Sequence, residues 1–358
     1  MKIKTIYIDD EDEELRKYQR IFENDVRAKN QFEIIAANSQ KQIGDLINEV
    51  KNEKPELILV DLDLTIPKEG LLLGVSGAAL STALREEFPE VPIILFTKTD
   101  FLKIQKVNPK VLSSLDETIY KSDLFKGDAN LDCLDKLANG YKQLRNEKSK
   151  TWIELLEIIE APKNDYDSLK VSDPPTISEN VWSVFDAAYW IRNTLIKYPG
   201  ILYDPIHSAA FLGLSRDAFL SESVQKLFSE AKYSKIFVPI EGRWWKSRLQ
   251  EIAESIMDEK EKDLIIREGF PLAWDRINKT NIDRSKCVFC GKEPAEWVCH
   301  ILKKPVMIKC SLRYKPDSRP SVMDEARVSY NAIRTSNEVN DEKFDPIEYD
   351  MLPNIRKK

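Results

Sequence analysis

Histidine is almost absent from this chain of 358 residues, which contains only His207 and His300. Such scarcity argues against acid–base catalysis by histidine and against a phosphorelay histidine within the chain. Long apolar runs are missing too. No stretch approaches the roughly 18 residues that cross a bilayer, and the N-terminus lacks the apolar core of a signal peptide. We therefore expect a cytoplasmic protein that contacts no membrane.

The bulk composition is that of a soluble protein with more than one domain. Hydrophobic residues make up 42% and charged residues 32% of a chain longer than one ordinary domain. The formal net charge is −6, but it is unevenly spread. Residues 264–320 contain 12 Lys or Arg against 6 Asp or Glu, a local balance of +6. A basic segment of this kind is compatible with a DNA-binding face, although it is more often a solvated surface.

Short apolar runs alternate with amphipathic segments over residues 1–126. This alternation predicts an α/β fold: a doubly wound, five-stranded parallel sheet with helices on both faces. In such sheets the functional residues gather beyond the carboxyl ends of the strands. The five expected strands lie in the segments KTIYIDD, FEIIAAN, ELILVDLD, VPIILFTK and ETIYK.

Carboxylates follow the first and third of these strands. Asp9 and Asp10 stand side by side at the end of one, and Asp61 and Asp63 come directly after the other. Like charges held together repel, so the arrangement is costly unless something positive lies between them. We expect Asp9, Asp10 and Asp61 at the same edge of the sheet. Three carboxylates in one pocket suit a hard divalent cation such as Mg²⁺.

Two further strand ends complete this set, with Thr97 at the fourth strand and Lys121 at the fifth. The order Asp-Asp, Asp, Thr, Lys on successive strands resembles the receiver domain of two-component response regulators. The resemblance covers residues 1–126 and implies a flavodoxin-like fold in which Asp61 accepts a phosphoryl group. The donor that it implies is a sensor histidine kinase or a phosphotransfer protein.

The resemblance also implies a role for each residue of the set. The Thr97 hydroxyl would hydrogen-bond the phosphoryl group, and the Lys121 ammonium would pair with it. The chemistry agrees, because an aspartate nucleophile attacks phosphorus while cations offset the charge on the transferring group. The implied Mg²⁺ ligands are three carboxylates and one backbone carbonyl, those of Asp9, Asp10, Asp61 and Asp63, respectively.

Several positions depart from the pattern of that family. The loop between Asp61 and Gly77 is longer than usual, Lys98 stands where a small residue is usual, and Thr118 takes the place of a switch aromatic. We expect the acceptor chemistry to be intact. The alternative is a degenerate receiver that binds partners without being phosphorylated.

Apolar residues at spacings of three and four predict a long helix over residues 131–161. Its narrow apolar stripe is typical either of a seam that pairs two copies as a homodimer or of a helix that packs on its own domain. The stripe comprises Leu134, Leu137, Tyr141, Leu144, Leu155 and Ile158.

Composition divides the whole chain into six segments. Aromatic-rich helical patterns follow a polar, Pro-rich stretch, and a Cys-rich stretch precedes a polar C-terminus. The expected order is a receiver domain (1–126), a connecting long helix (127–162), a linker (163–179), a helical output domain (180–280), a zinc module (281–320) and an extended tail (321–358).

Four of the five cysteines lie between residues 287 and 310. In a cytosolic chain such a cluster indicates a metal site rather than disulfides. Cys287 and Cys290 form a C-x-x-C pair followed by glycine, which resembles the knuckle of a zinc ribbon or treble clef. Adjacent side chains on a strand point to opposite faces, so either Cys299 or His300, but not both, would join Cys310 as the second pair of ligands. We predict structural Zn²⁺, and the alternative is a set of reduced structural thiols.

Two weaker patterns bear on DNA binding. Residues 204–219, DPIHSAAFLGLSRDAF, resemble a helix-turn-helix in which Gly213 makes the turn and Ser215 caps the next helix. Many helical hairpins share this pattern. In EGRWWKSRL, residues 241–249, Trp244 and Trp245 stand among basic residues, which is typical of base stacking or of a buried tryptophan with a wet flank.

These features together favour a response-regulator-like signalling protein that is phosphorylated on Asp61 and controls a zinc-stabilised output region that binds DNA or protein. One alternative is a phosphate-sink or adaptor receiver whose C-terminal part docks proteins. Another is an effector that processes nucleic acid under receiver control. A phosphoacceptor is favoured over a turnover enzyme, because residues 180–320 show no nucleophile–base pair.

Overall fold

Each of the five apolar runs forms a strand of one parallel sheet. The strand order, β2-β1-β3-β4-β5, is the doubly wound order of flavodoxin-like folds. The predicted fold class is therefore confirmed. The strands are β1 (Ile3–Asp9), β2 (Phe32–Asn38), β3 (Leu57–Val60), β4 (Ile93–Thr97) and β5 (Glu117–Tyr120).

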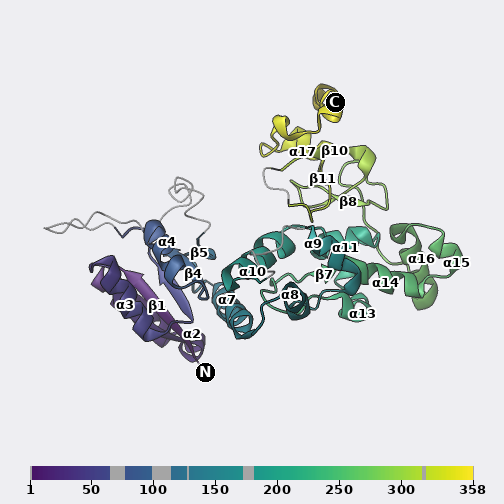
Figure 1. Ribbon diagram of the computed structural model, residues 1–358. Helices are drawn as coiled ribbons and strands as arrows, with labels where there is room; N and C mark the ends of the chain where they lie inside the picture. Colours follow the sequence, from purple (N-terminus) through teal and green to yellow (C-terminus); the bar gives the residue numbers. More distant parts are fainter. Residues whose placement is uncertain are drawn as a thin grey trace. The chain divides into compact units, whose positions relative to one another are not determined.

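The computed structural model describes residues 2–64, 77–98, 114–126, 129–171, 181–316 and 320–357. The chain forms two units (Figure 1). Each unit has buried apolar clusters of its own. The N-terminal unit comprises Met1–Leu155 and Pro175–Tyr189, and the C-terminal unit comprises Leu156–Pro174 and Trp190–Lys358. None of the described helices combines the length and the apolarity that crossing a bilayer requires.

Amphipathic helices flank the sheet because their apolar residues recur at three- and four-residue spacings. In α1 (Asp12–Asn24) the residues Leu15, Tyr18 and Phe22 are buried at these spacings. Strands β3 and β4 are buried throughout, as expected of central strands covered on both faces. Further helices of this unit are α2 (Val26–Gln31), α3 (Ile43–Glu53), α4 (Gly77–Glu87) and α7 (Ala129–Asn146).

The single long helix expected over residues 131–161 is instead two helices, α7 and α8 (Trp152–Ile158). The backbone leaves the helical path between them, where Lys150 has a φ of 50°. The Tyr141 hydroxyl of α7 donates a hydrogen bond of 2.5 Å to Asp116, which precedes β5. The α7 part of the apolar stripe packs on its own unit, as the second alternative expects, and its buried residues are Leu134, Leu137, Tyr141 and Leu144.

The C-terminal unit begins as a set of short helices around an aromatic core. Phe219, Phe228, Trp244 and Phe270 are among the buried side chains that fill this core. The elements are α9 (Tyr166–Lys170), α11 (Pro205–Phe211), α12 (Arg216–Phe219), α13 (Glu222–Leu227), α14 (Lys246–Ile256), α15 (Glu259–Lys262) and α16 (Ile266–Asn278), with the two-residue strands β6 (Leu202–Tyr203) and β7 (Trp244–Trp245). Helix α10 (Val184–Trp190) belongs to the N-terminal unit except for its last residue.

The predicted linker over residues 163–179 is folded in its first part. Lys163–Asp165 form a 3₁₀ turn that leads into α9. The Ser247 hydroxyl of α14 donates a hydrogen bond of 2.6 Å to Asp165, and Leu169 is buried. Residues 163–170 are therefore part of the C-terminal unit, because they have packing partners that a free linker lacks.

The helix-turn-helix pattern gives the predicted local structure but only short helices. Gly213 has a φ of 74°, and a Cβ there would lie 2.0 Å from the Arg267 carbonyl oxygen, so only glycine fits the turn. The Ser215 hydroxyl accepts a hydrogen bond from the Ala218 N–H at 3.1 Å and caps α12. Trp244 and Trp245 are both buried, so neither offers a face on which a base could stack.

The C-terminal forty residues are not an extended tail, and that prediction is wrong. Buried side chains of this segment, such as Val328 and Phe344, share one core with three of the cysteines. The sequence showed no periodicity here because its helices are too short to display one. The elements of this part are β8 (Trp297–Val298), β9 (Pro305–Val306), β10 (Ser311–Tyr314), β11 (Ala326–Ser329), α17 (Tyr330–Thr335), α18 (Pro346–Tyr349) and α19 (Leu352–Lys357).

Candidate functional site

The polar residues of the N-terminal unit gather at the carboxyl ends of four adjacent strands. Asp9 is the last residue of β1, and Asp61 directly follows β3. Thr97 ends β4, and Lys121 directly follows β5. Main-chain hydrogen bonds fix the register, from the Asp61 N–H to the Ile8 carbonyl (3.0 Å) and from the Lys121 N–H to the Thr97 carbonyl (2.8 Å). The sheet therefore brings these residues to one edge.

A buried ammonium group lies between two of the carboxylates. Lys121 Nζ is 2.8 Å from Asp9 Oδ2 and 2.5 Å from Asp61 Oδ1. The three side chains are only 3%, 3% and 9% exposed. Burial opposes the ionisation of Asp9, but hydrogen bonds, first among them that from Lys121, outweigh it and hold the pKa of Asp9 below its usual range. Lys121 thus offsets the charge repulsion between Asp9 and Asp61.

The pKa values of Asp61 and Asp10 are shifted in the opposite direction to that of Asp9. Burial raises the pKa of Asp61 in spite of the neighbouring Lys121 charge. Burial also raises the pKa of Asp10, to about 6. No cation contacts Asp10 among the residues that the structure describes. The pocket therefore has more negative charge than Lys121 alone neutralises, which is the condition under which a second cation binds.

Three aromatic side chains surround the Lys121 ammonium and were not anticipated from the sequence. The ring centroids of Tyr7, Tyr18 and Phe96 lie 5.3, 5.5 and 5.7 Å from Lys121 Nζ. The Tyr7 hydroxyl donates a short hydrogen bond to Asp9 Oδ2. Of these three residues, only Tyr7 could have been placed near the site from the sequence. Residues two apart on a strand share a face, and Tyr7 lies two residues before Asp9.

The remaining predicted positions are placed as follows. Asp63 is exposed, and its backbone N–H donates a hydrogen bond of 2.9 Å to Asp61 Oδ2. Thr97 is fully buried at the end of β4. Lys98 Nζ pairs with Glu14 Oε1 of α1 at 2.8 Å. Thr118 lies within β5. Most of the long loop after Asp61, residues 65–76, lies outside the described residues.

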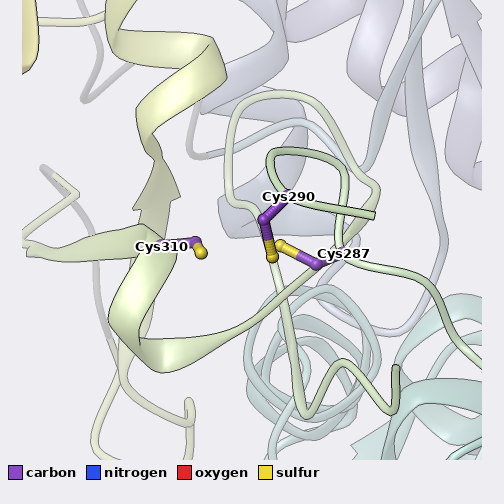
Figure 2. Close-up of side chains that lie close together, drawn as sticks. All are labelled: Cys287, Cys290 and Cys310. Carbon is purple, nitrogen blue, oxygen red and sulfur yellow. The ribbon is translucent and has the colours of Figure 1, made fainter. Parts of the chain in front are cut away.

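A second cluster, of three cysteines, lies in the C-terminal unit. The Sγ atoms of Cys287, Cys290 and Cys310 are within 4.8 Å of one another, and Figure 2 shows the side chains converging from two separate segments. Gly291 closes the knuckle with a φ of 70° and an N–H hydrogen bond of 2.9 Å to the Cys287 carbonyl. Among the described residues this is the group whose ligand atoms lie close enough together for one metal ion.

The chemistry of the three sulfurs fits a soft cation. Burial raises the pKa of Cys310 to about 12, and the neighbouring thiols add to this shift. Three thiolates at such short range repel one another, so they need a positive ion to be stable together. Thiolate ligands at a knuckle are typical of Zn²⁺, which takes four ligands in structural sites. The three cysteines would supply three of the four.

Cys299 and His300, between which the sequence left the choice of a ligand open, both lie outside this group. Cys299 Sγ accepts hydrogen bonds from the N–H groups of Leu302 (3.5 Å) and Ser329 (3.3 Å) in the core. The His300 ring lies 5.7 Å from the Tyr314 ring, and burial, helped by the Lys303 charge, lowers the pKa of His300 to about 4. The structure therefore brings together Cys287, Cys290 and Cys310 but adds neither of these two residues.

No family model and no curated protein matches the chain. Among solved structures, it is similar to a CheY-like response regulator receiver domain from Methanospirillum hungatei JF-1 (17% identity, 41% of this chain and 100% of the other, TM-score 0.28). It is also similar to the response regulator protein TrrA from Thermotoga maritima in complex with Mg²⁺-BeF (17%, 37% and 99%, TM-score 0.27).

A third similar structure is the histidine kinase ThkA in complex with TrrA (18% identity, 35% of this chain and 90% of the other, TM-score 0.26). The similar part of this chain is its N-terminal 40% or so. TM-scores of 0.26 to 0.28 carry no argument about fold or activity. The doubly wound fold of the N-terminal unit rests on its own strand order.

Proposed function

We propose that this chain is a response-regulator-like signalling protein whose N-terminal unit accepts a phosphoryl group on Asp61. One observation carries the proposal. Lys121 Nζ contacts Asp9 and Asp61 together, at the sheet edge that also holds Asp10 and Thr97. A nucleophilic carboxylate, a cation to receive the charge of the phosphoryl group and a hydroxyl donor are the parts that phosphoryl transfer to aspartate needs.

Each side chain has a distinct task in this proposal. An Asp61 oxygen attacks phosphorus as the bond to the donor breaks, releasing histidine from a phosphohistidine donor or acetate from acetyl phosphate. Lys121 moves from pairing two carboxylates to pairing the phosphoryl oxygens. The Thr97 hydroxyl donates a hydrogen bond to the same group. Mg²⁺, when bound, neutralises charge on the transferring group. The residues that would hold it are Asp9, Asp10 and Asp61 and the backbone carbonyl of Asp63.

We take the phosphoryl donor to be a sensor histidine kinase or a phosphotransfer protein. The chain has only two histidines, and both lie in the C-terminal unit: His207, whose Nδ1 is 2.9 Å from Asp204, and the half-buried His300. A phosphohistidine donor would therefore come from another protein.

A small phosphodonor tests the acceptor without knowledge of the kinase. The full-length chain is incubated with acetyl phosphate, with Mg²⁺ or with excess chelator, and its intact mass is measured. We expect the mass of one phosphoryl group to be added only when Mg²⁺ is present. A mass that does not change at any Mg²⁺ concentration would support the alternative of a degenerate receiver, which binds partners without being phosphorylated.

Replacing Asp10 by Asn is expected to stabilise the metal-free N-terminal unit at pH 7 by about 1–3 kcal/mol. Burial raises the pKa of Asp10 to about 6, so between about pH 4 and pH 6 the folded state keeps a proton that the unfolded state has lost, and at pH 7 it carries a costly buried charge. The wild-type protein therefore loses stability as the pH rises from about 4, the unfolded pKa, to about 6. The variant lacks this loss. Urea unfolding in the presence of chelator, at pH 5 and pH 7, measures the difference.

The same Asp10→Asn change should weaken Mg²⁺ binding, so that stability and metal affinity move in opposite directions. Glu11→Gln is the matched control, because it removes a neighbouring carboxylate that is exposed. If Asp10→Asn is less stable than the wild-type protein in the absence of metal, then the ionised Asp10 carboxylate does not destabilise the folded state and the prediction is wrong.

For the C-terminal unit, we infer a zinc-stabilised region that binds a protein or DNA. Docking of a protein is favoured by exposed apolar side chains at α16, where Ile265, Leu272 and Ile277 are 47%, 43% and 51% exposed. DNA binding rests on the basic balance of residues 264–320. The local structure does not support DNA binding at the two patterns found in the sequence. Helix α12 has only four residues, too few for a recognition helix, and Trp244 and Trp245 are buried and cannot stack on bases.

Retention of the full-length chain on duplex DNA at low and high salt separates these two outputs. Salt-sensitive retention that is weakened by Arg216→Ala, a change at an exposed cation of α12, would support DNA binding. Absence of retention would support the adaptor, and salt-sensitive retention that this change leaves unaffected would mean that DNA binds at another position. Metal-dependent cleavage of the DNA would instead support the nucleic-acid-processing effector.

A further inference from the structure

A cavity of about 420 Å³ lies within the C-terminal unit, apart from both sites described above. Its walls come from α11, the starts of α14 and α16, strand β8 and the segments before β6 and β11. Its size is in the range of small-molecule sites, which are typically about 300–1,000 Å³. Both histidines of the chain, His207 and His300, are among its lining residues.

A hydrogen-bonded network fixes one wall of this cavity. Lys246 Nζ lies 3.1 and 3.0 Å from the two carboxylate oxygens of Asp324, and the Tyr203 hydroxyl donates a short hydrogen bond to the same carboxylate. The Lys246 ammonium also lies 5.1 Å from the centroid of the Tyr203 ring. Because three separate segments meet in this network, the wall is preorganised rather than formed by loose surface chains.

His207 is held in one orientation at the first turn of α11. Asp204 caps this helix by accepting hydrogen bonds of 2.9 Å from the backbone N–H groups of Ile206 and His207. The same Asp204 oxygen is 2.9 Å from His207 Nδ1. Nδ1 is thereby engaged by the carboxylate, and Nε2 is the ring nitrogen left for a ligand.

The lining carries more positive charge than its carboxylates neutralise. Asp324 pairs with Lys246, and Glu325 pairs with Arg327 at 2.5 Å, so neither compensates a further cation. The third lining carboxylate, Glu296, accepts a hydrogen bond of 3.1 Å from the Ile308 N–H and can offset at most one further cation. No carboxylate pairs with Lys197, Arg267 or Lys303 in the part of the chain that the structure describes, and all three line the cavity. Such a surplus favours an anionic ligand, above all a phosphate group.

Aromatic side chains make up much of the remaining wall. The Tyr203 and Phe211 rings lie 5.7 Å apart in an edge-to-face arrangement, and Tyr198 and Trp297 also line the cavity. Aromatic faces of this kind pack against planar rings and accept any base. We propose that the cavity binds a nucleotide, with its phosphate held by the unpaired cations and His207 and its base against the aromatic wall.

Calorimetric titration of the full-length chain tests this proposal. The probes are AMP, GMP, CMP and UMP, with inorganic phosphate and adenosine as the two halves of the ligand. We expect at least one nucleotide to bind about tenfold more tightly than either half, because both walls must contribute. Inorganic phosphate that binds as tightly as every nucleotide, or no binding by any probe at millimolar concentration, would overturn the proposal.

Two variants tie the binding to the cavity. Arg267→Gln should weaken nucleotide binding about tenfold or more, since it removes a charge-assisted contact. Lys226→Gln, which removes an exposed cation of α13 away from the lining, should leave it unchanged. Equal affinities of the two variants would overturn the proposal. Asp61→Asn should also bind normally, so this experiment and the receiver proposal can fail independently.

Discussion

Replacing Asp61 by Asn should lower phosphoryl incorporation from acetyl phosphate by at least about a hundredfold. The amide keeps the shape of the side chain but has no anionic oxygen to attack phosphorus. We expect the fold to survive, because burial makes the Asp61 charge costly and Lys121 still pairs with Asp9. Intact mass measured against time, at saturating Mg²⁺, gives the rate for both proteins.

Asp63→Asn is the matched control for this result. It removes the same charge two residues away, from an exposed side chain that the proposal uses only through its backbone carbonyl. We expect its phosphorylation rate to stay within about threefold of the wild-type rate. If Asp61→Asn is phosphorylated as fast as Asp63→Asn, then the acceptor is another residue and the proposed role of the sheet edge is wrong.

Replacing Cys287 by Ser should remove bound zinc and destabilise the C-terminal unit by more than about 3 kcal/mol. Cys287 is buried in the core that the knuckle shares with β10, β11 and α17. Loss of one of three converging thiols leaves two, which cannot hold the ion against competing water or chelator. Metal analysis of the purified protein and urea unfolding of the C-terminal unit measure the two effects.

Serine variants of two other cysteines serve as controls for this experiment. Cys133→Ser, in α7 of the N-terminal unit, should leave the zinc content unchanged. Cys299→Ser should also retain zinc, although it alters a buried position, because Cys299 Sγ lies outside the three-sulfur group. Loss of zinc from the Cys299→Ser protein would instead make Cys299 the fourth ligand. A wild-type chain purified without zinc would favour reduced structural thiols.

The sheet and its acidic edge could be predicted because they depend on local pattern. Each strand is a short apolar run, and the carboxyl ends of parallel strands meet at one edge whatever the intervening loops do. The positions of Asp9, Asp61 and Lys121 follow directly from this rule. The C-x-x-C-G knuckle was equally local, since one turn sets the distance between Cys287 and Cys290.

Contacts between distant segments could not be predicted in the same way. Nothing in the spacing of Tyr18 and Phe96 places both rings around Lys121, because they come from a helix and a strand far apart in the sequence. The cavity of the C-terminal unit likewise joins Tyr203 to Asp324 across more than a hundred residues. The long helix was overpredicted because its apolar spacing resumes in α8 after a break.

The burial of the C-terminal segment in this core has a consequence for truncated forms of the protein. Leu352 and Ile355 of α19 are buried in the same core as Cys287 and Cys310. A truncation before residue 321 would strip the cysteine knuckle of half its apolar support. Such a fragment should be degraded rapidly by proteases. The cysteine-rich segment is therefore an internal part of a folded unit and not an independent zinc module.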